Sequence, residues 1–205
     1  MTKHVFIAAV IVSFGMFLCP LNAQHISKNI PVSEFSSITL ESVGNIVFTQ
    51  SSGYGCRIEG PKEYVDKTRI TVKNGKLTIS YKEKNVKNGK KLMFYITSPE
   101  LTKVELDGVG NFSADGTLKL KKVDFELDGV GNCTVKDLRC DEVSAQVDGV
   151  GSMKLHVDCR ALRAEVDGVG SITLSGKADE AYLKRGGIGS IRHKNLECRR
   201  INKRK

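Results

Sequence analysis

Residues 107–111 read Asp-Gly-Val-Gly-Asn, and the pattern Asp-Gly-Val-Gly-Asn/Ser returns at 128–132, 148–152 and 167–171. A degenerate copy, Gly-Gly-Ile-Gly-Ser, occupies residues 186–190. The first residues of successive copies lie 21, 20, 19 and 19 residues apart. A repeat of this length indicates a protein in which identical structural units pack only against their neighbours.

Apolar residues occupy alternate positions on both sides of each copy. One column, directly after the motif, contains Phe112, Cys133, Met153, Ile172 and Ile191. Another column, directly before it, contains Leu106, Leu127, Val147 and Val166. A period of two residues is typical of strands and not of helices. Each unit therefore contains two short strands and their turns.

A unit of about 20 residues is too short for a strand–helix–strand arrangement. The sequence predicts an all-β fold, a parallel β-helix-like stack of about 20-residue coils spaced by ~4.8 Å. We take the right-handed form, because crossover connections between parallel strands have that hand. The alternative is a series of antiparallel hairpins with Asp-Gly turns. Stacking is favoured because whole units match position by position.

The five-residue motif is interpreted as a tight turn. Both glycines are expected to adopt positive φ, where a side chain would clash. The valine between them is expected to point into the core. The aspartate is expected to accept hydrogen bonds from the backbone N–H groups of its own turn.

Residues 24–100 read as a strand-rich section that caps the first coil. Strands are expected at 37–41, 46–50, 57–59, 69–73, 76–82 and 92–97. Asn74-Gly75 lies between two alternating runs, which is a strong hairpin signal. Residues 61–67 are consistent with one helical turn. A cap is needed because the open end of a β-helix exposes unpaired strand edges.

Residues 1–23 are interpreted as a secretory signal peptide. Lys3 precedes an apolar run at residues 5–18, and Ala23 offers a cleavage point. Lipidation of Cys19 is the alternative, although Phe17-Leu18 is a poor context for it. No later segment is long and apolar enough for a transmembrane span. The predicted organisation is thus signal peptide 1–23, strand-rich part 24–100, and β-helical part 101–205 with a basic C-terminal tail.

The net charge of +9 is concentrated in that tail. Residues 184–205 contain nine Lys/Arg and one acid, whereas residues 24–183 contain 22 of each sign. The candidate binding residues are Arg192, Lys194, Arg199, Arg200, Lys203 and Arg204. Such a tail binds polyanions such as lipopolysaccharide or acidic glycan, or it is a solvated end cap. Nucleic acid is disfavoured by export and by the lack of aromatic residues among the basic ones.

The repeated acidic and polar positions are two further candidates. Stacked aspartates, with neighbouring glutamates, could bind Ca²⁺, or each aspartate could only close its turn. The weak calcium candidates are Asp107, Asp128, Asp148 and Asp167. Gly186 replaces the aspartate in the fifth copy, which favours the turn. The column Asn111, Asn132, Ser152, Ser171 and Ser190 predicts a hydrogen-bonded ladder, or a strip that reads a glycan. No cofactor is predicted.

Five cysteines remain after residue 23. Cys140 and Cys159 share one repeat position, so a disulfide between stacked neighbours is predicted. Cys198 falls in the same column two coils from Cys159, with Ala178 between them. Cys133 is expected to be a buried free thiol, and a bond between Cys56 and Cys198 is left open.

Catalytic motifs are missing from the sequence. It contains no Gly-x-Ser-x-Gly elbow, no His-Glu-x-x-His and no phosphate loop. The enzymatic alternative is a β-helical polysaccharide lyase, which would need an acid pair or an acid–arginine cluster in a walled groove. Short, uniform turns build no such groove, so we expect a protein that is not an enzyme.

Four segments, taken in their order along the chain, resemble the GIN-domain family, the auto-transporter adhesin head domain of Bacteroidetes-type bacteria. They are residues 35–40, 44–50, 72–82 and 95–101, followed by the glycine-rich coils. The resemblance covers nearly all of the chain after residue 23. It implies a strand-rich fold with β-helical coils and a place in the cell envelope, and it supplies no catalytic residues. The cysteines and the basic tail depart from the family.

Together these features predict a secreted protein that is periplasmic or associated with the outer membrane. Its expected function is that of a non-catalytic binding module, an adhesin head that recognises a glycan, a matrix protein or an envelope polyanion. The alternative is a structural β-helix module that assembles into oligomers by edge or end pairing.

Overall fold

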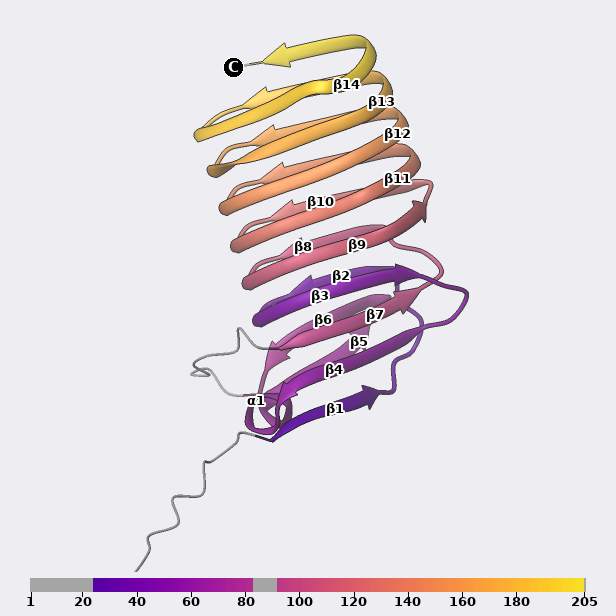
Figure 1. Cartoon of the computed structure of the whole chain (residues 1–205), viewed down its shortest axis with the longest axis vertical. Coiled ribbons are helices and arrows are strands. Elements are labelled where there is room, and N and C mark those ends of the chain that lie inside the picture. The colour runs from indigo at the N-terminus through magenta and orange to yellow at the C-terminus, as the bar shows by residue number, and fades with distance from the viewer. Residues whose placement is uncertain (1–23, 83–91, 205) are drawn as a thin grey trace, which may run out of the picture.

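The computed structural model describes residues 24–82 and 92–204, so the predicted signal peptide lies outside the described residues. Nearly all of this chain is strand, with one short helix (Figure 1). The first part contains β1 (His25–Ile30), β2 (Ser37–Leu40), β3 (Val43–Gln50), β4 (Gly55–Pro61), α1 (Lys62–Lys67), β5 (Thr68–Lys73), β6 (Lys76–Tyr81) and β7 (Met93–Ser98). The second contains β8 (Lys103–Leu106), β9 (Val109–Lys119), β10 (Lys122–Leu127), β11 (Val130–Val147), β12 (Val150–Val166), β13 (Val169–Arg185) and β14 (Ile188–Arg204).

The repeat forms a solenoid of stacked parallel coils (Figure 1). Val109 pairs with Val130, Val130 with Val150, Val150 with Val169, and Val169 with Ile188. The predicted parallel β-helix is therefore confirmed, and the alternative of antiparallel hairpins is wrong for these coils. In β11 to β14 the two strands expected in each coil are one continuous strand that passes around the corner.

The solenoid also continues into the first part of the chain. β2 and β3 pair in parallel with β8 and β9, and β6 and β7 pair in parallel with β2 and β3. Val43 lies opposite Val109, and Asn45 lies opposite Asn111. Residues 41–45 read Glu-Ser-Val-Gly-Asn and so resemble the repeat motif. They are the direct spatial neighbour of the first repeat turn. After β3 the chain returns to the N-terminal end of the stack before it continues at β8.

Antiparallel strands and α1 close that N-terminal end. β1 pairs with β4 and β4 with β7, while β5 pairs with β6. The predicted Asn74-Gly75 hairpin is confirmed, with φ of 52° at Asn74 and 73° at Gly75. The predicted helical turn is confirmed as α1, whose Val65 side chain is buried.

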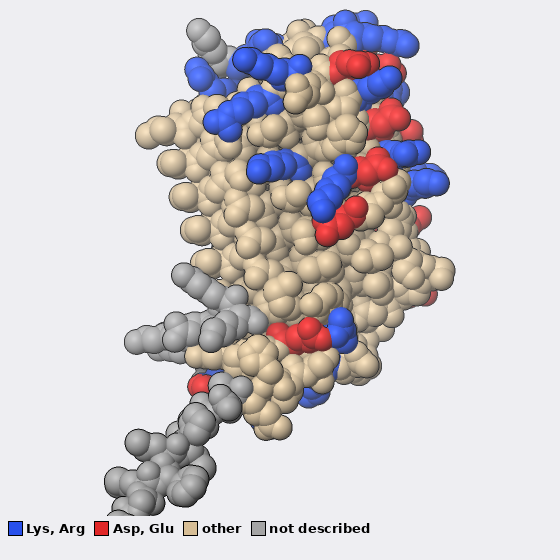
Figure 2. Space-filling model, viewed as in Figure 1, with Lys and Arg blue, Asp and Glu red and all other residues tan. Residues whose placement is uncertain are grey.

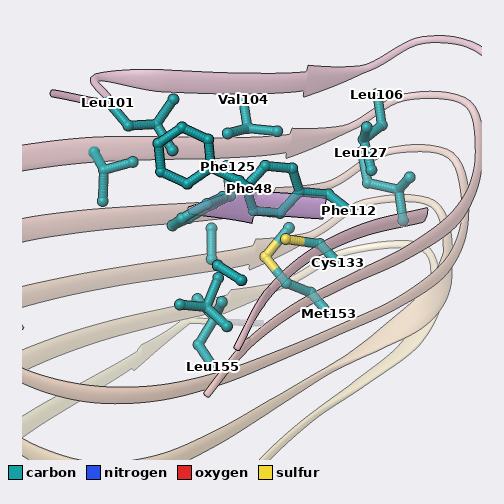
Figure 3. Packing of buried hydrophobic residues seen from close by; sticks show 14 of the residues in the cluster. Phe48, Leu101, Val104, Leu106, Phe112, Phe125, Leu127, Cys133, Met153 and Leu155 are labelled. Carbon is teal, nitrogen blue, oxygen red and sulfur yellow. The ribbon is translucent and has the colours of Figure 1, made fainter. Parts of the chain in front are cut away.

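The inward columns form one continuous apolar core. Phe48, Phe112 and Phe125 are each 1 % exposed and lie next to one another (Figure 3). Their ring centroids are 6.1 Å apart for Phe48 and Phe112, and 6.0 Å apart for Phe112 and Phe125. One coil alone could not bury this surface, so the coils must fold as a stack.

The valine of each turn points outward, contrary to the prediction. Val130, Val150 and Val169 are about half exposed, and Ile188 is 79 % exposed. They stand at the corner where each coil begins, on the edge to the left in Figure 1. The same edge in Figure 2 is lined by uncharged side chains that project from the surface. The alternation of buried positions continues through the turn: counted in twos from buried Leu127, the inward positions are glycines, and Val130 falls on the outer face with Asp128 and Asn132.

The glycines are explained by close approach of the coils, not by positive φ at both positions. Among the repeat glycines only Gly151 and Gly187 have positive φ. A Cβ atom added at Gly131 would lie 1.6 Å from the carbonyl oxygen of Gly110 in the preceding coil. The corresponding distance is 1.7 Å from Gly110 to the carbonyl oxygen of Gly44. The backbones of successive turns are thus in direct contact, which leaves no room for a side chain at these glycines.

The backbone N–H groups of each turn donate hydrogen bonds to carbonyl groups of the preceding coil. The N–H groups of Asp128 and Gly129 both donate to the carbonyl of Leu106, at 3.1 and 2.7 Å. The N–H of Val130 donates to the carbonyl of Gly108 at 2.9 Å. In the described part of the chain, no turn N–H donates to the aspartate of its own turn. The expected role of aspartate as a turn-closing acceptor is therefore wrong.

Candidate functional site

The basic segment forms the last described coil of the solenoid, not a tail. β14 pairs in parallel with β13 from Ile188 opposite Val169 to Arg204 opposite Lys184. The strand forms because the alternating apolar positions continue, with Leu196 buried and Ile191 and Ile201 packed against the core. The coil therefore holds its basic side chains on a rigid scaffold.

All six predicted binding residues are exposed on this coil, at the upper end of the molecule in Figure 2. Arg199 pairs with Asp179 at 3.4 Å, and Arg200 pairs with Glu180 at 2.9 Å. The other four have no ion pair with any carboxylate among residues 24–82 and 92–204. These four are Arg192, Lys194, Lys203 and Arg204, and we name them the cationic rim. Their positive charge is available to a partner in solution.

Two inward columns of the core also end in basic residues. Val166 pairs with Arg185, and Leu183 pairs with Lys203. Charges at core-facing positions prevent a strand edge from pairing with another chain. The change of both columns from apolar to basic is visible in the sequence when the repeat is aligned as far as residue 203.

Carboxylates gather beside the first repeat turns. The carboxylate oxygens of Glu105, Asp107 and Asp128 lie within 4.8 Å of one another. Burial and the charge of Glu105 raise the pKa of Asp107, and burial and the charge of Asp148 raise the pKa of Asp128. Burial opposes ionisation of Glu105 too, but hydrogen bonds from Lys76 and Thr39 outweigh it and lower its pKa.

This cluster matches the requirements of calcium poorly. Ca²⁺ takes six to eight oxygen ligands, and here Lys76 and Lys103 already pair with Glu105 at 3.0 and 3.5 Å. The other two predicted aspartates have separate partners. Asp148 accepts a hydrogen bond from Gln146 at 2.7 Å, and Asp167 pairs with Lys184 at 3.4 Å. The structure thus brings together two of the four aspartates, with Glu105.

We expect Asp128→Asn to raise the free energy of unfolding at pH 7 in EDTA. A carboxyl whose pKa is raised by folding destabilises the folded state when it is ionised. That cost is fully present above the folded pKa, and it disappears as the pH falls below the unfolded pKa. Urea unfolding at pH 7 and pH 3 measures this, with a gain expected only at pH 7.

The control is Asp141→Asn, which removes an exposed carboxylate outside the turn column. Millimolar Ca²⁺ provides the opposing test. Stabilisation of the wild-type protein by Ca²⁺, lost in Asp128→Asn, would contradict our interpretation and establish a calcium site.

The predicted polar ladder beside the turns is confirmed from Asn111 to Ser152, whereas among residues 24–82 and 92–204 no side-chain hydrogen bond joins Ser171 or Ser190 to it. Asn111 Nδ2 donates to Asn45 Oδ1 at 2.7 Å, and Asn132 Nδ2 donates to Asn111 Oδ1 at 2.9 Å. Ser152 Oγ donates to Asn132 Oδ1 at 2.6 Å. The ladder extends upstream to Asn45, a position outside the predicted column. From Asn45 to Ser152, each side chain is thus hydrogen-bonded to its neighbour in the adjacent coil.

Two of the five cysteines described are neighbours on adjacent coils, and the other three lie apart from them. Cys140 lies opposite Cys159, and both are thiols in the structure. Cys133 is buried as predicted, and burial raises the pKa of its thiol. Burial also raises the pKa of Cys56 to about 12. Cys56 is in β4 and Cys198 in β14, at opposite ends of the solenoid (Figure 1), so a bond between them is excluded.

Comparison with known proteins identifies relatives over nearly the whole described chain. A family model described as "Putative auto-transporter adhesin, head GIN domain" matches residues 34–204. No curated protein matches. A crystal structure of a putative adhesin from Bacteroides fragilis is similar, with 28 % identity, a TM-score of 0.68, and coverage of 88 % of this chain and 96 % of that chain.

Two solved structures from Parabacteroides distasonis share the fold. A putative adhesin has 21 % identity and a TM-score of 0.80, and covers 89 % of this chain and 78 % of its own. A putative lipid binding protein has 18 % identity with the same TM-score and coverage. At these identities the likeness concerns the fold alone. Within the described residues, no helix has the length and apolar character to span a bilayer.

Proposed function

Because this chain belongs to the family of the auto-transporter adhesin head GIN domain, we propose that it is a non-catalytic binding module of the cell envelope that recognises an acidic glycan. The surface that makes the contact is the cationic rim of β14. The observation that carries this proposal is a set of four exposed basic side chains without ion pairs in the described chain, on one rigid coil.

Charge and shape both favour a polyanion as the partner. Repeated carboxylates or sulfates along a glycan match basic groups spaced along a strand, and attraction between exposed charges needs no deep pocket. The resulting affinity is electrostatic, so it decreases when salt shortens the Debye length. An acidic glycan also agrees with a protein that carries a predicted signal peptide.

The basic residues of β14 also disfavour the alternative of a structural module that assembles end to end. A module that assembles end to end would present an apolar end, whereas Arg185 and Lys203 occupy core-facing positions here. Like charges would meet if two such ends approached each other. The alternative of a polysaccharide lyase is supported only by fold analogy, which does not establish function. The names of the family and of its structural neighbours point instead to adhesins or binding proteins.

Neutralising the cationic rim should abolish most of the binding. The variant Arg192→Gln/Lys194→Gln/Lys203→Gln/Arg204→Gln removes four charges and leaves the apolar positions of β14 intact. We expect affinity for an immobilised sulfated glycan to decrease about a hundredfold at low salt, since each basic residue near an anionic surface contributes about 1 kcal/mol before screening. Surface plasmon resonance at several salt concentrations measures this.

The matched control neutralises four exposed basic residues at the other end of the stack. This variant is Lys28→Gln/Arg69→Gln/Lys73→Gln/Lys82→Gln. Equal losses in the two variants would mean that only net charge matters and would reject the rim as a site. Anionic lipid vesicles form a separate arm, and binding to vesicles without binding to the glycan would reject the glycan as the ligand.

A further inference from the structure

Two thiols lie side by side on adjacent coils. Cys140 in β11 pairs in register with Cys159 in β12. Neighbouring strands are ~4.8 Å apart, which is within the separation of Cα atoms that a disulfide spans. Both thiols line the same groove, and each shifts the pKa of the other, as adjacent groups do.

This groove gives reagents access to the pair. Its volume is about 680 Å³, and its lining includes Cys140, Cys159, Cys198, Arg160 and Lys177. Cys140 is half-buried and Cys159 is 8 % exposed. Cys133, by contrast, is 1 % exposed and lies in the core. The pair is thus the place in the described chain where two thiols are adjacent and reachable.

The Cys140 thiol also prepares its neighbour for reaction. It lowers the pKa of Cys159, while burial and the carboxylates of Asp158 and Asp179 act in the opposite direction. The thiolate is the nucleophile in disulfide exchange. Cys159 therefore ionises more readily than a thiol buried without a partner.

We propose that Cys140 and Cys159 are a redox modification site, oxidised to an intercoil disulfide by a disulfide reagent that enters the groove. The Cys159 thiolate attacks one sulfur of the reagent, which forms a mixed disulfide and expels the first reagent thiolate. Cys140 then loses its proton and attacks the Cys159 sulfur of the mixed disulfide, which expels the second reagent thiolate. Two protein thiols are oxidised by two electrons, the reagent disulfide is reduced to two thiols, and the protons released pass to solvent or to the thiolates.

Cys198 lies in the same column and serves as a comparison, because no thiol of the described chain is adjacent to it. Ala178 pairs with Cys159 on one side and with Cys198 on the other, so Cys198 is two coils from the pair. Its thiol contacts the backbone carbonyl of Arg200 at 3.2 Å. Cys198 lines the same groove without an adjacent thiol, so it is expected to stop at the mixed disulfide. The site does not depend on the proposed glycan function.

Peptide mapping tests the proposal directly. The reduced protein is incubated with glutathione disulfide at pH 8, alkylated and digested with trypsin, which cuts after Arg139, Lys154 and Arg160. A disulfide joins peptide 140–154 to peptide 155–160, and we expect this linked species as the main product. The oxidised protein should also unfold about 5–10 °C higher than the reduced protein, because the bond closes a loop of some 20 residues in the unfolded chain.

Serine variants provide the controls. Cys198→Ser should keep both the linked peptides and the thermal shift, whereas Cys140→Ser and Cys159→Ser should lose both. Circular dichroism spectra identical to that of the wild-type protein show that the variants are folded. Glutathione retained separately on Cys140 and Cys159, or no reaction there while Cys198 is modified, would overturn the proposal.

Discussion

Gly131→Ala is expected to destabilise the solenoid by about 3–5 kcal/mol, among the largest effects of a single substitution. The added methyl would lie 1.6 Å from the carbonyl oxygen of Gly110. The clash is between methyl and backbone, so no rotamer change can relieve it. The two coils would have to separate and lose ladder hydrogen bonds on both sides of the turn, because Val130 and Asn132 pair in register there. Urea unfolding followed by circular dichroism measures the loss.

Gly116→Ala is the matched control for this prediction. Gly116 is in β9 and exposed, and a Cβ atom there would have no neighbour within 4 Å. We expect a change within about 0.5 kcal/mol, as for other exposed positions. If both variants lost similar stability, the cost would come from the conformational preference of glycine in general. The interpretation that coil contact selects glycine would then be wrong.

Phe112→Ala should cost about 4 kcal/mol, because it removes a fully buried aromatic side chain from the middle of the stack. The Phe112 ring contacts Phe48 in the preceding coil and Phe125 in the core (Figure 3), so the cavity opens between coils. Aromatic contacts of this kind contribute about 0.5–1.5 kcal/mol beyond the buried area. The midpoint of urea unfolding should fall sharply, whereas the spectrum of the remaining folded protein should keep its strand signal.

The control replaces Val130, an apolar residue that follows the buried Leu127 by three positions but faces outward. Val130 is 49 % exposed, so Val130→Ser should change stability by less than about 0.5 kcal/mol. A buried valine would instead lose about 1.5–3 kcal/mol of transfer free energy. A large loss at Val130 would mean that the turn valines are covered by a neighbour in solution.

The repeat spacing and the alternating columns were enough to predict the architecture and most of the core. Copies spaced by 19 to 21 residues require stacked units, and period-2 columns specify which residues such as Phe112 and Val147 face inward. The hairpin at Asn74-Gly75 was equally predictable, because local turn chemistry specifies it. The hydrogen-bonded asparagine ladder followed from the columns, since in-register stacking places like residues opposite each other.

The construction of the turns and the position of the ends depend on contacts between coils, which a sequence pattern does not specify. The sequence does not show by apolar character alone that Val130 points outward, although counting in twos from Leu127 places it on the outer face with Asp128 and Asn132. Nor does it indicate that Gly131 is selected by the carbonyl of Gly110, since that contact is between coils 21 residues apart. Residues 41–45 became neighbours of the first repeat through a reversal of chain direction along the stack, which leaves no local signature. Local pattern fixes which face of a strand is buried, but the distance between backbones in different coils is set by the packing of the whole stack.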